Sequence, residues 1–229
     1  MHWAKIAKLA TFLAVLATVA IGTLPAFHWA KAGLRSMAER PGPIVATPEE
    51  TRAILGAVLE RMKLIGVPPP PPEPGEAPRP EPKRILVLAD QSLCLAETTK
   101  PGCVSESADD LLISELDAFA PRKLRLELVA ANQAPQHLDL SGIPTTKVVS
   151  SSEIQKIFKG GWWDDFYKRY PATSGFVRVS QPVLTKDRQQ ALIYVAHYCG
   201  GLCGTGTVLL LKRSGSTWRI VKKEMLWIS

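Results

Sequence analysis

The sequence predicts an α+β protein: an N-terminal membrane helix, followed by one domain of helices packed on a C-terminal antiparallel β-meander. Three observations predict it. An uncharged, mainly apolar run opens the chain, helical patterns with apolar residues three to four apart fill its middle, and short strand-like runs follow Ser174. The chain has 229 residues, which leaves room for one ordinary domain with its own core.

A membrane-targeting segment, residues 1–32, comes first. Two lysines precede the apolar run of residues 9–30, which is apolar on every face rather than along one stripe. Its length suits a spanning helix of about 20 residues, and a signal core of roughly 7 to 15 also fits within it. Because Leu24 and Lys31 interrupt the small-residue pattern of the available cleavage sites, the sequence favours an uncleaved signal-anchor over a cleaved signal.

The next three segments are a connector over 33–46, a helix over 47–66 and a proline-rich stretch over 67–83. Thr47 and Glu50 match a capping box, and the apolar stripe that follows them makes this helix part of the domain. The proline-rich stretch lacks most of its amide donors, so it forms neither helix nor sheet. It is either a linker or, as we prefer, a loop within the domain.

The extracytoplasmic domain spans residues 84–229. Its first predicted elements are a strand over 84–92, helices over 107–119 with Ser107 as N-cap and over 121–132, a strand over 145–150, and a helix over 151–158 capped by Ser151 or Ser152. A helix over 160–171 follows. Its aromatic side chains recur at helical spacing, which is more typical of a core than of a cofactor site: Trp162, Trp163, Phe166, Tyr167 and Tyr170.

The C-terminal meander contains the motif CGGLCGTG, residues 199–206, at the tip of a predicted hairpin. A strand follows the glycines, whereas a phosphate-binding loop requires a helix there. Cys199 and Cys203 have three residues between them, one more than a thioredoxin-type dithiol, and neither cysteine pair has zinc-knuckle spacing. The motif therefore predicts a stapled turn in which four glycines supply positive φ angles: Gly200, Gly201, Gly204 and Gly206.

The four cysteines lie in two pairs that are close in the sequence, as expected for local disulfides. Disulfides persist in oxidising compartments, so the cysteines favour such a compartment. We expect disulfides between Cys94 and Cys103 and between Cys199 and Cys203, although four cysteines allow three connectivities. This places the domain outside the cytoplasm.

Other function classes find little support in the residues. Residues 1–40 carry five basic residues and one acidic one, so this segment holds more than half of the formal net charge of +7. The sequence contains no recognised nucleic-acid-binding motif, so the positive charge does not indicate nucleic-acid binding. His197 lies two residues before Cys199 on a predicted strand, but a thiol enzyme also needs a third, orienting group. We therefore assign no catalytic residue, metal site, cofactor or nucleic-acid partner.

The last 70 or so residues resemble a family of exported bacterial proteins of unknown function. The shared features are a W-x-x-F-Y-x-x-Y-P motif, a CGxLCGxG turn and a terminal WIS. The matching residues are Trp163, Phe166, Tyr167, Tyr170, Pro171, Ser174, Gly175, Ala191, Tyr194, Cys199, Gly200, Cys203, Gly204, Gly206, Trp218, Trp227 and Ser229. The resemblance implies an α+β domain outside the cytoplasm and brings no known activity with it.

Three functions stay open. We favour a non-enzymatic binding or assembly domain, anchored in a bacterial inner membrane or, after cleavage of the signal, periplasmic or secreted, with an envelope protein as partner. The second is a small hydrolase or thiol enzyme that uses His197 with Cys199 or Cys203. The third is a small-ligand pocket of a cystatin-like or nuclear-transport-factor-like fold, lined by Trp162 or Trp163.

Overall fold

The computed structural model describes residues 42–62, 85–95, 106–171 and 173–229, and its compact unit runs from Pro43 to Ser229. The predicted signal segment and the proline-rich stretch lie outside the described residues. Among the helices of the described ranges, none is long and apolar enough to span a membrane.

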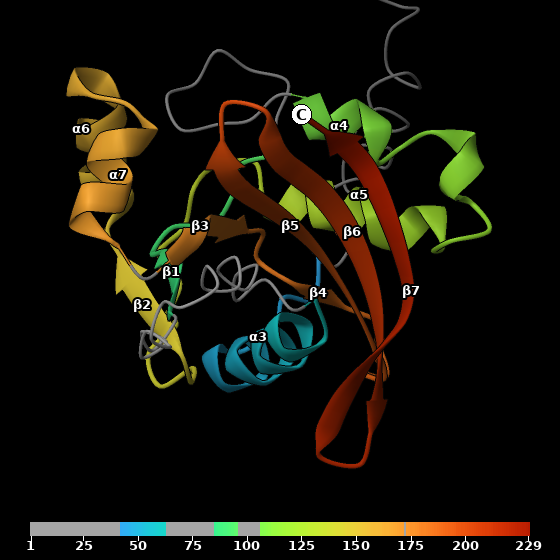
Figure 1. The fold of residues 1–229 in the computed structure, drawn as a ribbon. Coiled ribbons are helices and arrows are strands. Elements are labelled where there is room, and N and C mark those ends of the chain that lie inside the picture. Colours follow the sequence, from blue (N-terminus) through green and yellow to red (C-terminus); the bar gives the residue numbers. More distant parts are fainter. Residues whose placement is uncertain (1–41, 63–84, 96–105, 172) are drawn as a thin grey trace, which may run out of the picture. The chain divides into compact units, whose positions relative to one another are not determined.

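One seven-stranded sheet organises this unit (Figure 1), with the order β2-β1-β3-β5-β6-β7 and with β4 paired to β5. The strands are β1 (Ile85–Ala89), β2 (Thr146–Val149), β3 (Thr173–Val179), β4 (Val183–Leu184), β5 (Gln190–Gly200), β6 (Cys203–Ser214) and β7 (Thr217–Ile228). β1 is parallel to both of its neighbours, and the other pairs are antiparallel. The α+β class is thus confirmed, but the sheet is mixed, because the predicted meander continues into three parallel strands.

The helix α3 (Pro48–Met62) covers one face of the sheet. Its predicted capping box is present: the Glu50 amide donates to Thr47 Oγ1 over 3.3 Å, and the Thr47 amide donates to the Glu50 carboxylate over 3.0 Å. The apolar stripe of α3 packs with side chains from alternate positions of β3, β5 and β6. The packing begins in the predicted connector, where Ala46 is buried and Val45 bridges to Val183.

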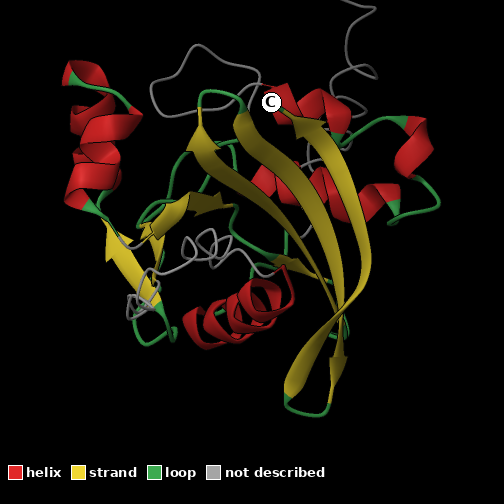
Figure 2. Ribbon diagram, viewed as in Figure 1, coloured by secondary structure: helices red, strands yellow, loops and turns green. Residues whose placement is uncertain are grey.

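The other face carries two groups of helices (Figure 2). The helices α4 (Glu106–Asp110) and α5 (Arg122–Ala131), with a short 3₁₀ turn (Ser114–Leu116) between them, lie on the β4–β6 side. The helices α6 (Ser151–Gly160) and α7 (Trp163–Arg169) cover β1 and β3. The half-buried ring of Tyr198 packs against both groups, so it marks the junction between them.

The predicted helix over 107–119 is wrong in extent, because α4 begins before Ser107 and ends at Asp110. The physical reason is Arg125, a fully buried side chain of α5. Its guanidinium donates to the carbonyl oxygens of Leu111 (2.7 Å), Ile113 (2.9 Å) and Ala120 (3.1 Å). The carbonyls of Leu111 and Ala120 therefore accept from a side chain rather than from a helical amide, and the Ile113 carbonyl accepts from both Arg125 and the Leu116 amide of the 3₁₀ turn.

The caps and aromatic residues need two further corrections. The N-cap of α6 is Ser150, whose hydroxyl accepts from the Glu153 amide, rather than Ser151 or Ser152. Phe166 and Tyr170 are buried as predicted, but Trp162 precedes α7 and its side chain is 64% exposed, because residue 162 has extended rather than helical backbone.

Candidate functional site

A pocket of about 270 Å³ lies between α6 and the sheet. β1 and β2 run parallel, so their carboxyl ends meet at one edge, where Ala89 ends β1 and Ser151 opens α6. Ligands of sheets with parallel strands bind by preference at this edge. The lining residues are Ala89, Ser151, Ile154, Gln155, Phe158, Phe176, Arg178 and Tyr198.

The pairing of β3 with β5 forms the floor of the pocket. Phe176 lies opposite Tyr198, and Arg178 lies opposite the small side chain of Ala196. Because successive strand residues point to opposite faces, these four share the face beneath α6. The rings of Phe176 and Tyr198 are stacked with their centroids 5.0 Å apart, and Phe158 of α6 lies 5.7 Å from Phe176.

Arg178 supplies the charge of this site. Burial lowers the pKa of its guanidinium below the usual value, and the attraction of Tyr198 offsets this only in part. An arginine still keeps its charge at neutral pH. The cation therefore sits in mainly apolar surroundings, where an anion interacts with it more strongly than in water.

Ser151 contributes a second polar group. Its amide donates to the Asp90 carboxylate over 2.7 Å, which places the start of α6 against the end of β1. Its side chain is 5% exposed, and its hydroxyl has no hydrogen-bond partner within the described part of the chain. Because buried polar atoms are nearly always hydrogen-bonded, this hydroxyl has an unused capacity to donate or accept at the wall of the pocket.

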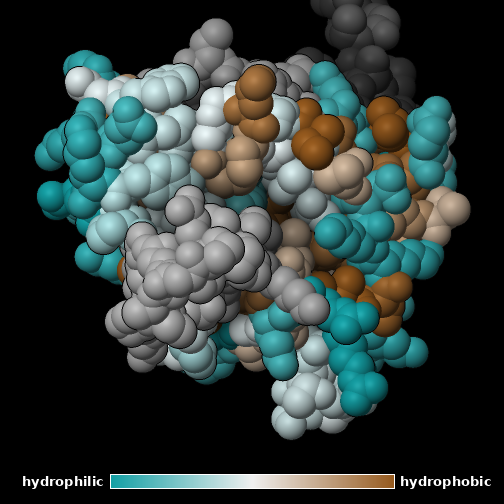
Figure 3. Space-filling model, viewed as in Figure 1, coloured by the Kyte–Doolittle hydropathy of each residue, from teal (hydrophilic) through white to brown (hydrophobic). Residues whose placement is uncertain are grey.

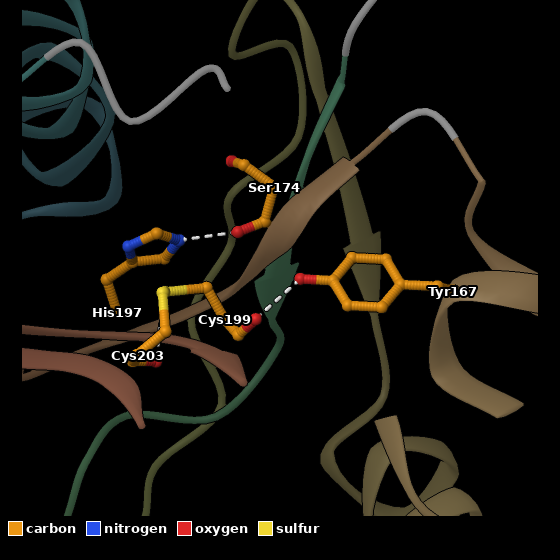
Figure 4. The surroundings of a disulfide bond; sticks show 5 residues. All are labelled: Tyr167, Ser174, His197, Cys199 and Cys203. Carbon is orange, nitrogen blue, oxygen red and sulfur yellow. Dashed lines mark hydrogen bonds between the residues drawn. A yellow bond between two sulfur atoms is a disulfide. The ribbon is translucent and has the colours of Figure 1, made fainter. Parts of the chain in front are cut away.

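The predicted site residues lie elsewhere, at the tip of the β5–β6 hairpin (Figure 4). Cys199 and Cys203 form a disulfide with their Cα atoms 5.1 Å apart, so in this state neither sulfur is a nucleophile. The Tyr167 hydroxyl donates to the Cys199 carbonyl over 2.8 Å and holds the tip against α7. Cys94 is buried and disulfide-bonded, whereas Cys103 lies outside the described residues, so their pairing stays a prediction.

His197 is held by the backbone. Its Nε2 lies 2.9 Å from the carbonyl oxygen of Ser174, which can only accept, so Nε2 carries the proton (Figure 4). It projects to the face that α3 covers, opposite to the face of Arg178, since it pairs with Val177 rather than Arg178. The structure therefore does not bring His197 to the pocket.

The motif forms the turn of the β5–β6 hairpin, but the expectation that its glycines supply positive φ angles is wrong, because none of Gly200, Gly201, Gly204 and Gly206 has a positive φ. Two of them are needed for space instead. A Cβ on Gly206 would overlap Trp227 Nε1 and the Tyr194 hydroxyl, and one on Gly204 would lie 3.1 Å from the ring of Trp227. The glycines thus let the Trp227 indole cross β6 and donate to the Tyr194 hydroxyl over 2.6 Å.

A second, more open hollow lies beside the hairpin tip on the α3 face, and residues of β5, β6 and β7 line it. Apolar side chains at or near it are exposed, with Leu202 92% and Ile228 71% accessible. Figure 3 shows hydrophobic surface gathered around the hairpin tip and the C-terminus.

The sequence reasoning missed Arg178 and Phe158, and it expected Trp162 or Trp163 to line a cavity. Neither tryptophan is among the described residues around the pocket. The available signal was the run "GFVRVS", residues 175–180, in which Arg178 is the one charge among buried strand residues. Such a charge inside an apolar strand requires a specific partner or role.

We expect His197 to make stability depend on pH between about 7 and 5.5. Burial lowers the pKa of His197, and its hydrogen bond to Ser174 only partly opposes this. The unfolded chain therefore takes up a proton near the ordinary value of about 6.5 while the folded chain stays neutral, so stability is complete above that value and is lost as pH falls below it.

The measurement is the urea midpoint at pH 7.5 and pH 5.5 for the wild type and His197→Gln, whose amide can also donate to Ser174. The variant should lose less stability over this range. Equal losses of stability in the two proteins would mean that groups other than His197 cause the pH dependence. Carboxyl groups with a lowered pKa, such as Glu153, affect stability at more acidic pH than the range measured here.

No family model, curated protein or solved structure matches this chain.

Proposed function

We propose that this chain is a non-enzymatic binding domain outside the cytoplasm, which residues 1–32 tether to the membrane and which holds a small ligand in the pocket beneath α6. The observation that carries the proposal is the pocket itself, with the half-buried side chain of Arg178 beside stacked aromatic rings. Convergent polar groups within a mainly apolar hollow are typical of small-molecule sites.

The surroundings of the pocket favour binding over catalysis. Phe176, Arg178 and Tyr198 lie on paired strands, and the Glu153 carboxylate ties α6 to α7 by accepting from Arg169 Nε and the Tyr170 hydroxyl, each over 2.6 Å. Such a site is largely formed before a ligand arrives, which lowers the entropic cost of binding. The Cys199–Cys203 disulfide supports the extracytoplasmic placement, because such bonds persist in oxidising compartments.

The test uses the full-length, oxidised chain in detergent and ligand-observed NMR with small neutral, anionic and cationic amphiphiles. Gln155→Trp introduces a large ring at an exposed position that lines the pocket, and Lys156→Trp introduces the same ring at the next exposed position, outside the lining. We expect Gln155→Trp to abolish binding and Lys156→Trp to preserve it. Equal effects of the two variants, or no binding by the wild type, would contradict the proposal.

A second candidate function is assembly with an envelope protein through the hairpin tip. The exposed apolar side chains of Leu202, Met225 and Ile228 favour it, since exposed apolar patches mark interaction surfaces. A photoreactive residue in place of Leu202 should then cross-link to a defined protein in cells, and the same residue in place of exposed Lys186 should not. Identical cross-linking from both positions would count against it.

A further inference from the structure

We propose that the pocket beneath α6 binds small apolar molecules that carry a hydroxyl group, with the ligand hydroxyl hydrogen-bonded to Ser151 and the apolar body between α6 and β3. This inference rests on the proposed binding function and adds the chemical class of the ligand. Three features of the pocket carry it: the unused hydroxyl of Ser151, the apolar walls and the size.

Three consecutive serines, residues 150–152, form the start of α6, and the hydroxyl of the middle one is not used by the helix. The Ser150 hydroxyl caps α6 by accepting from the Glu153 amide, and it lies 3.1 Å from the Ser152 hydroxyl. The Ser151 amide donates to the Asp90 carboxylate, but the Ser151 hydroxyl has no hydrogen-bond partner among the residues that the structure describes. The start of the helix is therefore capped and held without this hydroxyl.

The burial of Ser151 makes its hydroxyl a recognition group. The residue is 5% exposed, and it lines the pocket. A buried hydroxyl that lacks a hydrogen bond destabilises the empty protein, so a ligand that supplies the bond recovers this loss. Serine has one side-chain dihedral, and its hydroxyl both donates and accepts. It can therefore pair with a ligand hydroxyl by rotation about χ1, without movement of the helix.

The walls beside Ser151 are mainly apolar. Ile154 and Phe158 line the pocket from α6, and Phe176 lines it from β3, with its ring 5.7 Å from that of Phe158. Arg178 is the one charged residue of the described lining, and it already interacts with other groups of the protein, so no ligand contact is assigned to it. An apolar body suits these walls, because its transfer from water to such surroundings is favourable.

The size of the pocket limits the apolar body. Its volume is about 270 Å³. A cavity of about 150 Å³ with apolar walls is large enough to hold benzene. The pocket therefore has room for one ring with a short substituent, and benzyl alcohol is a probe of this size that carries one hydroxyl.

The experiment compares benzyl alcohol with ethylbenzene, in which a methyl group replaces the hydroxyl. Calorimetry measures both dissociation constants for the oxidised full-length chain in lipid nanodiscs, with empty nanodiscs as the blank. Ser151→Ala should weaken benzyl alcohol binding at least fivefold and change ethylbenzene binding less than twofold, because only benzyl alcohol loses a hydrogen bond. The control is Ser152→Ala, at the next, exposed position outside the lining, which should leave both dissociation constants unchanged.

A measurement on the wild type decides the question even if Ser151→Ala does not fold. In the bound state, the methylene protons beside the hydroxyl of benzyl alcohol should show nuclear Overhauser effects to the β protons of Ser151. The ring protons should show them to Ile154 and Phe158. The reverse orientation, with the ring protons against Ser151, would overturn the inference.

The outcomes separate this inference from the proposed function. If Ser151→Ala changes the binding of both compounds equally while Gln155→Trp blocks both, the pocket binds ligands but does not recognise a hydroxyl. If neither compound binds to the wild type, the inference fails, whereas the proposed function is decided by its own, wider set of amphiphiles.

Discussion

Replacing Arg125 with methionine should destabilise the domain by about 3 kcal/mol or more. The Arg125 side chain is fully buried, and it donates to three carbonyl oxygens in the segment that connects α4 and α5. Each buried carbonyl that loses its donor costs about 1–3 kcal/mol. Methionine fills most of the space of the arginine and donates nothing, so the loss reports the hydrogen bonds rather than a cavity.

The removal of a buried charge could offset part of this destabilisation, but that effect is smaller here. Replacing both partners of a buried ion pair with apolar groups is often neutral, because neither charge then has to lose its water on folding. Asp117, the acidic partner of Arg125, is 58% exposed and stays hydrated without it, whereas the carbonyl oxygens of Leu111 and Ala120 remain buried acceptors.

Urea unfolding followed by tryptophan fluorescence measures the change in the free energy of unfolding. Arg122→Met, at an exposed position of the same helix, should lie within about 0.5 kcal/mol of the wild type. If Arg125→Met were as stable as the wild type, water would be donating to the carbonyl oxygens in place of the guanidinium, which would contradict the prediction.

Replacing Gly175 with alanine should also destabilise the domain by about 3 kcal/mol or more. Gly175 has a φ of 111°, which residues with a Cβ rarely adopt, and a Cβ there would overlap the Tyr198 carbonyl oxygen. Strain of this kind costs about 1–3 kcal/mol, and overpacking against the backbone adds a similar amount. β3 and β5 would have to separate where Phe176 and Tyr198 form the pocket floor.

The control for this prediction is Gly215→Ala in the turn between β6 and β7. Gly215 also has a positive φ, 62°, but nothing lies within 4 Å of the added Cβ. Its substitution should cost only the conformational term of about 1 kcal/mol. Equal unfolding free energies for the two variants would mean that the contact with Tyr198 is not a constraint.

The elements that the sequence predicted well are those fixed by local interactions. The capping box of α3 joins residues three apart, and its apolar stripe recurs along one helix, so both can be seen without the fold. The strands of the β5–β6 hairpin and its disulfide are equally local. Because these interactions join residues that are close in the sequence, the pattern of residues was enough to predict them.

The parts that could not be predicted depend on residues far apart in the chain. The interruption of the helix over 107–119 depends on Arg125, which binds carbonyls 12 and 14 positions earlier. The motif glycines match a turn, but Gly206 is required because Trp227 crosses it from β7. The pocket needs the register of β3 against β5 and the position of α6, neither of which the sequence pattern specifies.

The most direct test of the central claim is a titration of the ¹⁵N-labelled, oxidised chain with the amphiphile that binds in the ligand-observed experiment, followed at backbone amides. We predict that the amides of Ser151, Gln155 and Phe176 shift together and saturate, while Leu202 at the hairpin tip does not respond. Shifts centred on Leu202 and Ile228 with unchanged Ser151 and Phe176 amides would contradict the assignment of the pocket as the binding site.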